Sequence, residues 1–442
     1  MWDDAPALVS AIVLAMRTRP LRSPVTVTFD GRKVAAERGE PVAAALVGQG
    51  AHALARSAKF HRPRGPACFR GACDGCLARV NDVPNVMTCL VPAEDGMVIE
   101  SQNTLGTLET DFLRMTDWFF PQGMNHHELL AGVPGLQRVM QVFARRVAGL
   151  GRLPREIVAP RAAIRRSLDV LVVGAGPAGM AVATELARRG RAVEIVDDAL
   201  AAGGGAAALD EEDGPWRAIR DAFTESCARG AITLRCETTA AAFYGNDVLV
   251  VGQHPDTGAQ VVKARAVVIA TGAHDGVVAF EGNDVPGVMS ARAAGWLLAR
   301  GVLPGKSVVV VVSVGGGPVG DAFARNIASS GAPCEVTVFR GEPLRAIGSS
   351  RVKQVIVRDG AGREHTRKAD ALLIDAPRAP AYELCEQAGG ALVHEARGFV
   401  VKTERGKIRD GVWAVGEVTG APFDAAVVAK HAADLASRIC DA

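Results

Sequence analysis

Four of the nine cysteines stand close together, in the stretches "CFRGACDGC" and "NVMTCL". They are Cys68, Cys73, Cys76 and Cys89, and their spacing is C-x4-C-x2-C-x12-C. Zinc ribbons usually carry two C-x2-C knuckles, whereas this stretch has one. Plant-type [2Fe–2S] ferredoxins open with C-x4-C-x2-C and take a distant fourth thiolate. The spacing therefore favours a [2Fe–2S] cluster held by these four cysteines, with a zinc ion as the alternative.

The residues around these cysteines predict a small domain that positions them. "VTVTFDG" alternates apolar and polar residues up to Asp30-Gly31, and "RKVAAERGE" follows, which is the pattern of a β-hairpin. "PVAAALVGQG" is typical of a short helix that begins after a proline. Gly71 and Gly75 lie between the cysteines, where a flexible backbone can point amides at cluster sulfurs. We expect an α+β, β-grasp, ferredoxin-like domain over residues 24–103.

A glycine-rich motif follows a hydrophobic stretch in "LDVLVVGAGPAGMAVATELARRGRAVEIVDD". Gly174, Gly176 and Gly179 form G-x-G-x-x-G at the predicted start of a helix, around Pro177 and Ala178. The first glycine permits a tight turn, the second lets the backbone approach a pyrophosphate, and the third allows close helix–strand packing. Asp197 ends the next strand, where a carboxylate can accept hydrogen bonds from a ribose. This context predicts a dinucleotide site rather than a turn without a ligand.

Two further stretches favour FAD as that dinucleotide. Thr271-Gly272 end a buried strand in "AVVIATGAHD", and Gly416-Glu417 stand in "GVWAVGEVTG". Both resemble companion motifs of two-dinucleotide flavoproteins, the pyridine-nucleotide–disulfide oxidoreductase class. In that class an acidic residue of the second motif lies beside the flavin ribityl chain, which implies this role for Glu417. The resemblance predicts an FAD-binding domain split in sequence, over residues 167–290 and 395–442.

A second unit of the same kind is inserted between these two segments, in "SVVVVVSVGGGPVGDAFARNIASSGAPCEVTVFR". Gly315, Gly317 and Gly320 follow its first strand, and Arg340 stands where a ribose-binding acid is expected. An arginine there can accept the 2′-phosphate of NADP. It is equally consistent with a module that keeps the fold and binds no nucleotide. We predict an NAD(P)-binding-like domain over residues 291–394, with both interpretations open.

The other cysteines do not suggest thiol chemistry. A disulfide reductase of the flavoprotein class needs a C-x-x-C pair beside the flavin. The five remaining cysteines are solitary, which is typical of small packing residues; they are Cys227, Cys236, Cys334, Cys385 and Cys440. Nine cysteines without a disulfide framework in a large chain indicate a reducing, cytoplasmic compartment.

Composition sets the remaining limits. A chain of 442 residues is too long for one core and predicts about two to four domains. With 50 basic and 48 acidic residues, no overall field attracts nucleic acid. No apolar run approaches the ~20 residues of a membrane-spanning helix.

Two further segments are predicted to be helical: an N-terminal extension over residues 1–23 and a connector over residues 104–166. His126 and His127 lie next to each other in this connector. Adjacent side chains on a helix face different directions, so we do not expect these two histidines to bind one metal ion. The fold class is α/β: two Rossmann-like modules preceded by the small α+β domain.

The combination resembles a known family. "VTVTFDGRKVAAERGEPVAAALVGQG", "FHRPRG" and "GNDVPGVMSARAAGWLLARGVLPGK" resemble the alpha subunits of heteromeric sarcosine oxidase, and related subunits occur in hydrogen cyanide synthase, opine oxidase and hydroxyproline dehydrogenase systems. Alpha chains of this family often lack the ferredoxin cysteines or leave the cluster to a separate small subunit, whereas here they are built in. This sequence ends at "ASRICDA", without the aminomethyltransferase-like extension of sarcosine oxidase alpha.

The resemblance implies an electron-transfer subunit of an amino- or imino-acid dehydrogenase or oxidase. A partner, a D-amino-acid-oxidase-like flavoprotein subunit, oxidises the substrate and fixes its identity. This chain then passes electrons through FAD, through FMN at a subunit interface in some members, and through the cluster to a downstream acceptor, within a hetero-oligomer. The first alternative is a self-sufficient NAD(P)H-dependent reductase, which Arg340 favours. The second is an assembly subunit without redox cofactors.

Overall fold

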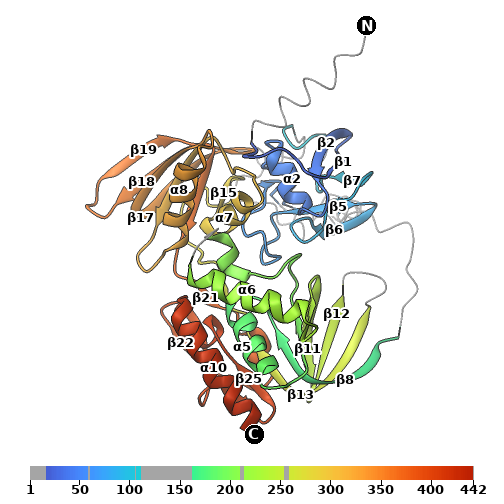
Figure 1. Cartoon of the computed structure of the whole chain (residues 1–442). Helices are drawn as coiled ribbons and strands as arrows, with labels where there is room; N and C mark the ends of the chain where they lie inside the picture. Colours follow the sequence, from blue (N-terminus) through green and yellow to red (C-terminus); the bar gives the residue numbers. More distant parts are fainter. Residues whose placement is uncertain are drawn as a thin grey trace, which may run out of the picture. The chain divides into compact units, whose positions relative to one another are not determined.

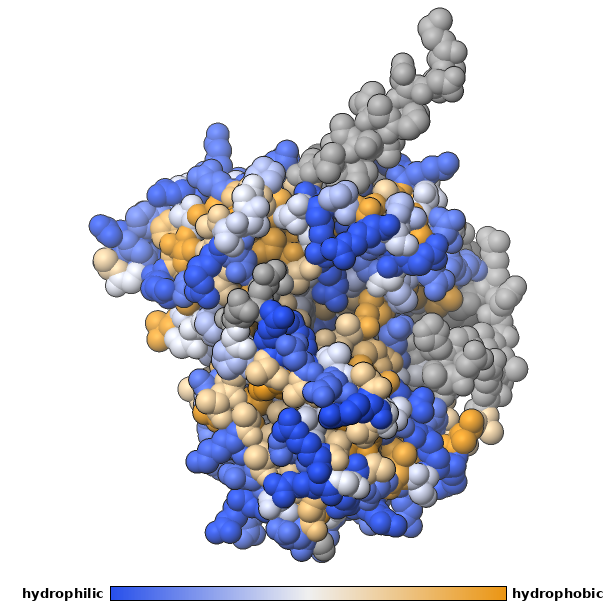
Figure 2. All heavy atoms as spheres, viewed as in Figure 1, coloured by the Kyte–Doolittle hydropathy of each residue, from blue (hydrophilic) through white to orange (hydrophobic). Residues whose placement is uncertain are grey.

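The structure is a computed structural model, and it describes residues 16–57, 60–104, 106–110, 162–209, 214–252 and 258–441. Most of the predicted connector, including His126 and His127, lies outside the described residues. Of the predicted N-terminal extension, residues 16–23 are described, and they form turns and one β-bridge between Arg17 and Val302 rather than a helix. In the described part, no helix is long and apolar enough to cross a membrane. On the face of the molecule shown in Figure 2, hydrophilic and apolar residues are mixed.

The chain divides into two compact units. The first comprises Met1–Ile157, Val278–Ser313 and Phe323–Asp375, and the second comprises Val158–Val277, Val314–Ala322 and Ala376–Ala442. Each unit therefore collects segments that are distant in sequence. The domain boundaries predicted from the sequence stay predictions.

The N-terminal part of the first unit is the expected small α+β domain (Figure 1). Its sheet has the strand order β2-β1-β7-β5-β6. The elements are β1 Pro24–Phe29, β2 Arg32–Glu37, α2 Val42–Gly48, β3 Ala55–Arg56, β4 Pro63–Arg64, β5 Leu77–Val80, β6 Val83–Met87 and β7 Val98–Glu100. β1 and β2 pair antiparallel through a turn at Asp30 and Gly31, both with positive φ, so the predicted hairpin is confirmed. Every residue of α2 is buried, because the helix packs into the core beside the sheet.

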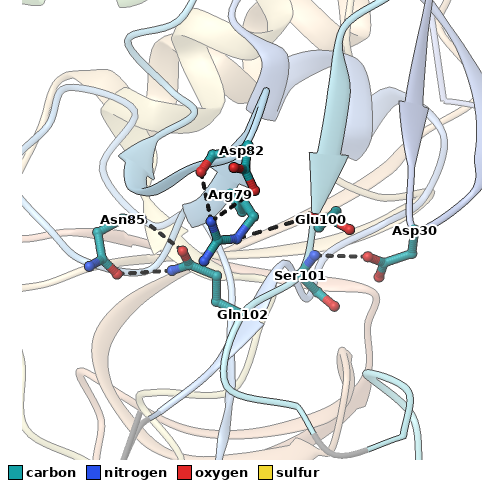
Figure 3. A network of polar contacts seen from close by, with 7 residues as sticks. All are labelled: Asp30, Arg79, Asp82, Asn85, Glu100, Ser101 and Gln102. Carbon is teal, nitrogen blue, oxygen red and sulfur yellow. Dashed lines mark hydrogen bonds and ion pairs between the residues drawn. The ribbon is translucent and has the colours of Figure 1, made fainter. Parts of the chain in front are cut away.

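A polar network holds the β5–β6 hairpin against β7 (Figure 3). The Arg79 guanidinium donates to the Asp82 carbonyl at 2.6 Å and lies 4.0 Å from the Glu100 carboxylate. Gln102 and Asn85 exchange two hydrogen bonds, of 2.8 and 3.0 Å. This network fixes the hairpin whose two ends carry Cys76 and Cys89.

The rest of the first unit carries most of the second Rossmann-like module, whose glycine loop and first helical turn, Val314–Ala322, are assigned to the second unit. The sheet of this module has the order β15-β20-β16-β17-β18-β19, and the edge strand β15, then β20, β16 and the first half of β17 are parallel. The elements of this region are β15 Val288–Ser290, α7 Ala291–Ala299, β16 Ser307–Val312, α8 Val319–Ser330, β17 Glu335–Gly348, β18 Val352–Asp359, β19 Glu364–Lys368 and β20 Ala371–Asp375. The Val-rich β16 is buried along almost its whole length, as expected of a central parallel strand.

The second unit is built on a sheet with the order β10-β9-β8-β13-β12-β11, and β25 and β24 extend it beside β13. Helices α5 and α10 lie side by side on this sheet, and α5 also packs on α6 (Figure 1). The main elements are β8 Ile164–Val173, α5 Pro177–Arg188, β9 Val193–Val196, α6 Pro215–Ala228, β10 Ile232–Arg235, β11 Thr238–Tyr244, β12 Asp247–Gly252, β13 Ala259–Ile269, β24 Lys407–Arg409, β25 Val412–Ala414 and α10 Ala425–Asp441. The smaller ones are η2 Gly204–Ala208, β14 Ala273–His274, β21 Ala379–Pro380, α9 Glu383–Gln387, β22 Ala391–Glu395, β23 Gly398–Lys402 and η3 Glu417–Thr419.

Candidate iron–sulfur and flavin sites

The long interval between the third and fourth cysteines is a hairpin. Cys76 directly precedes β5, Cys89 follows β6 by two residues, and Leu77 is paired with Met87. The hydroxyl of Thr88 donates to the Cys76 carbonyl at 2.7 Å, and the Thr88 amide reaches the same oxygen at 3.3 Å. The twelve intervening residues therefore return the chain to its starting point and bring the two thiols together.

The stretch from the first to the third cysteine is a glycine-dependent loop. Gly71 has φ +69°, and a Cβ there would lie 2.7 Å from Leu90 Cδ1. A Cβ on Gly75 would lie 2.0 Å from the Gly65 carbonyl oxygen. A side chain at Gly75 needs a backbone shift, and the positive φ of Gly71 strains any L side chain, so the sequence favours glycine at both positions of this loop.

The four thiols form two adjacent pairs. Cys68 hydrogen-bonds Cys73, which lowers the pKa of Cys73 to about 6 and raises the pKa of Cys68. Cys89 hydrogen-bonds Cys76, which lowers the pKa of Cys76 and raises the pKa of Cys89. A charge on Cys73 also acts on the pKa of Cys76, and a charge on Cys68 acts on the pKa of Cys89, so the two pairs interact electrostatically. The four cysteines thus form two interacting pairs, and their role as metal ligands stays a prediction.

This arrangement fits a [2Fe–2S] cluster, in which each of two irons takes two thiolates. Within the described residues, no group of three or more His, Cys, Asp or Glu side chains is placed to hold one metal ion. The cysteine pairs are consistent with that finding, because two pairs serve two metal ions. The Ala72 backbone amide donates to the Cys68 thiol, and the Gly75 amide donates to the Cys73 thiol. The Gly71 amide donates to the Cys89 thiol. Such amides stabilise thiolate charge and tune a cluster's potential.

The two motifs that carried the family resemblance meet beside this loop, inside the first unit. In "FHRPRG", Arg62 and Arg64 each lie 3.6 Å from the Asp284 carboxylate of "GNDVPGVMS". The Ser290 amide, at the other end of that motif, donates to the Ala67 carbonyl at 2.9 Å, next to the first cysteine. The stretch 62–67 therefore joins the cysteine loop to the second Rossmann-like module. Sequence reasoning used both motifs for recognition and assigned them no role.

The predicted FAD residues converge on one edge of the second unit's sheet. Strands β9, β8, β13 and β25 are neighbouring and parallel, so their carboxyl ends lie together. Asp197, Gly174, Thr271 and Gly416 follow these ends in that order. The carboxyl edge of a parallel sheet is where ligands bind in open α/β folds.

The three glycines of the first motif differ in what requires them. A Cβ on Gly174 would lie 2.5 Å from the Ala270 carbonyl oxygen, and a Cβ on Gly179 would lie 1.8 Å from the Gly174 carbonyl oxygen. At Gly176 the φ is −74°, and a Cβ would meet only the Gly204 Cα at 3.8 Å, an ordinary contact. The described chain therefore explains the first and third glycines but not the second. The need for glycine at position 176 is explained by a ligand that contacts the start of α5 closely, as the pyrophosphate of a dinucleotide does.

Asp197 and Thr271 hold this edge in shape. The Asp197 carboxylate accepts hydrogen bonds from the amides of Ala175 at 2.6 Å and Ala199 at 2.8 Å, so it fixes the glycine loop. The Thr271 hydroxyl donates to the Ala381 carbonyl at 2.7 Å, and Gly272 follows with φ +72°. Their contacts to a ligand stay predictions.

Gly416 and Glu417 approach the start of α5 from the C-terminal segment. Gly416 has φ +88°, and a Cβ there would lie 2.6 Å from the Cβ of Ala178, so only glycine permits this approach. Glu417 pairs with Arg378 at 3.2 Å, and both side chains are largely buried. Sequence reasoning missed Arg378, because it stands outside every recognised motif. These residues complete a cradle that fits FAD.

The second glycine motif has the predicted local geometry. Gly315 and Gly317 have φ of +78° and +103°, and Gly320 lies in the first turn of α8. Arg340 is paired with Val312, the last residue of β16, at the end of the parallel part of β17. β17 does not stop there: from Gly341 it pairs antiparallel with β18. A nucleotide at this module stays a prediction.

The solitary cysteines have the character of packing residues. All nine cysteines lie within the described residues and carry free thiols. Burial raises the pKa of Cys236 and Cys334 to about 11 and the pKa of Cys385 to about 12, and it also raises the pKa of Cys227. Because the thiolate is the nucleophile, these shifts disfavour thiol chemistry.

The comparisons with known protein families define the class. Residues 22–104 match the family described as "2Fe-2S iron-sulfur cluster binding domain". Residues 168–349 match the family "Pyridine nucleotide-disulphide oxidoreductase". The chain therefore combines a stretch that matches an iron–sulfur domain with a stretch that matches a flavoprotein oxidoreductase fold, and the matched families indicate a [2Fe–2S] cluster and FAD. The predicted fold class and these two cofactors are confirmed.

Individual relatives agree with this class. The chain is similar to the sarcosine oxidase alpha subunit of Rhizobium meliloti (strain 1021), with 28% identity over 418 residues, which are 84% of this chain and 42% of that protein. It is 33% identical to an opine oxidase subunit of Agrobacterium tumefaciens (strain Ach5) over 199 residues, 40% of this chain and 39% of that one. The chain thus spans about two fifths of the length of these relatives. The predicted family resemblance is confirmed.

A solved structure shares the fold. The crystal structure titled L-proline dehydrogenase from P. horikoshii superposes with a TM-score of 0.72 and 22% identity, covering 97% of this chain and 75% of the other. That match includes both Rossmann-like modules and the N-terminal domain, because it takes in nearly the whole chain.

Proposed function

We propose that this chain is the electron-transfer subunit of a heteromeric amino- or imino-acid dehydrogenase or oxidase. The observation that carries the proposal is the presence, in one chain, of two thiol pairs and a glycine cradle for a dinucleotide. FAD supplies two-electron chemistry with release of single electrons, and a [2Fe–2S] cluster accepts them singly. The relatives named as oxidase subunits support the same assignment.

The residues of the chain have distinct roles in this function. Gly176 and the amides at the start of α5 receive the FAD pyrophosphate, Asp197 accepts from the ribose, and Glu417 binds the ribityl chain. Cys68 and Cys73 hold one iron, and Cys76 and Cys89 hold the other. The substrate is oxidised on a partner, a D-amino-acid-oxidase-like flavoprotein subunit, and FMN lies at the interface with that partner. The assembly works in the cytoplasm and delivers electrons to a separate acceptor.

Anaerobic addition of the amino- or imino-acid substrate to the native complex tests the proposal. We expect flavin bleaching followed by the EPR signal of a reduced [2Fe–2S] cluster. In the Cys73→Ala complex we expect the bleaching without the EPR signal, because the cluster has lost one ligand. An unchanged flavin spectrum in a complex that holds all its cofactors would contradict the proposal.

A second candidate is a self-sufficient NAD(P)H-dependent reductase. Arg340 favours it, since it lies at the carboxyl end of the parallel part of β17, where a 2′-phosphate is recognised in NADP enzymes. NADPH added anaerobically to the purified chain alone separates the two functions. Rapid flavin bleaching that Arg340→Ala slows would establish the reductase, and no bleaching would support the electron-transfer role.

A further inference from the structure

Arg378 is held in place by two neighbours in the second unit, Glu417 and Phe423. Its Nη2 lies 3.2 Å from Glu417 Oε1. Its Cζ lies 4.2 Å from the centroid of the Phe423 ring, and that ring stacks on Trp216 with centroids 4.6 Å apart. A carboxylate on one side and an aromatic stack on the other fix the plane of the guanidinium.

The other end of the guanidinium lacks an acceptor. Nη1 of Arg378 is buried and has no hydrogen-bond partner in the part of the chain that the structure describes. The side chain is 13% exposed, so water reaches it poorly. Buried charged donors are nearly always paired, because leaving one unpaired is costly. A rigid, buried and unpaired N–H group therefore indicates an acceptor that the chain itself does not supply.

The position of Arg378 identifies that acceptor. Glu417, its ion-pair partner, follows Gly416, whose backbone packs on Ala178 at the start of α5. That start is where the glycine motif is expected to receive the FAD pyrophosphate. We propose that Arg378 binds FAD: Nη1 donates to an oxygen of the cofactor that carries negative charge, and Nη2 holds Glu417 against the ribityl chain. This inference rests on the FAD site of the proposed function.

The positive charge also has a consequence for the reduction potential. A flavin gains electron density on reduction, and a nearby cation favours the more negative form. Arg378 is therefore expected to bind reduced FAD more tightly than oxidised FAD. Its removal lowers the flavin's midpoint potential, which a purely structural arginine would not control.

The test uses the full-length chain and three single variants. Arg378→Gln removes the positive charge. Arg378→Lys keeps the charge but lacks the planar guanidinium group with its two terminal nitrogens. Arg358→Gln is the matched control. Arg358 also pairs with glutamates, Glu342 at 2.6 Å and Glu364 at 3.0 Å, but on the exposed β18–β19 edge of the other unit. FAD affinity is measured by titrating the apoprotein with FAD, and the midpoint potential by spectroelectrochemistry.

We expect Arg378→Gln to weaken the binding of oxidised FAD at least tenfold. It should weaken the binding of reduced FAD by about a further factor of ten. That additional tenfold loss lowers the midpoint potential of the two-electron couple by about 30 mV. Arg378→Lys should fall between wild type and Arg378→Gln, and Arg358→Gln should match wild type. An Arg378→Gln protein that folds normally, with wild-type FAD affinity and potential, would overturn the proposal.

A second variant is needed because Arg378→Gln leaves Glu417 largely buried without its partner. The double variant Arg378→Gln/Glu417→Gln removes both charges, and wild-type FAD binding by it would also overturn the proposal. These readouts need neither partner nor substrate. A wild-type chain that shows the Arg378 effect but takes no electrons from a partner would refute the proposed function alone.

Discussion

His52 makes the stability of the first unit depend on pH. Its side chain is 4% exposed, and burial together with the nearby Arg351 charge lowers its pKa from 6.5 to about 4, although Asp370 acts in the opposite direction. Its Nδ1 has no hydrogen-bond partner within the described residues. The folded unit therefore holds the neutral imidazole, whereas the unfolded chain binds a proton near pH 6.5.

The sign and size of the effect follow from linkage. Because the unfolded state binds more protons between pH 6.5 and 4, the free energy of unfolding is greatest above pH 6.5 and falls as the pH decreases. A difference of about 2.5 pKa units corresponds to roughly 3 kcal/mol in total, of which about 2 kcal/mol is lost between pH 7 and pH 5. His52→Gln should remove this dependence, since glutamine does not titrate.

The assay is hydrogen exchange of peptides from α2 to residue 57, at pH 7, 6 and 5, corrected for intrinsic rates. We expect the wild-type opening free energy to fall about 2 kcal/mol more than that of His52→Gln over this range. The variant difference cancels the other titrating groups. Parallel pH profiles for the two proteins would refute the reasoning, because His52 would then be protonated in the folded unit or exposed to solvent.

Three other positions lead to predictions that are simpler to test. Gly176→Ala should weaken FAD binding strongly without changing the circular dichroism spectrum, since its Cβ meets only Gly204 at 3.8 Å; Gly360→Ala, which also has room for a Cβ, should bind FAD normally. Arg17→Met should destabilise the first unit by about 3 kcal/mol in urea, because it leaves the Glu40 carboxylate buried without its partner at 2.6 Å. Arg79→Ala should cost about 1 kcal/mol or less in the same assay, because its partners Asp82 and Glu100 are half exposed.

The sequence was sufficient wherever the chemistry depends on local spacing. The cysteine spacing predicted a cluster loop, and in the structure a hairpin closes the long interval between Cys76 and Cys89. The glycine motifs likewise predicted strand–loop–helix turns, since Gly174 and Gly179 are required by contacts with nearby backbone. Parallel neighbours then carry Asp197 and Gly416 to the same edge.

The sequence was insufficient where distant side chains meet. Glu417 was predicted to face a ribityl chain, and its ion pair with Arg378 has no counterpart in any motif, because tertiary packing alone creates it. The contacts of Arg62 and Arg64 with Asp284 are of the same kind. The continuation of β17 beyond Arg340 depends on pairing with β18, which hydrophobic periodicity does not reveal.

The central claim is that Cys68, Cys73, Cys76 and Cys89 hold a [2Fe–2S] cluster in the same chain as a flavin domain. The most direct test is metal, acid-labile sulfide and flavin analysis of the anaerobically purified protein and its Cys73→Ala variant. The wild type should contain about two irons and two sulfides per chain with bound FAD, and the variant should lose the iron and sulfide but keep the FAD. Zinc in place of iron and sulfide, or a full cluster in the variant, would contradict the claim.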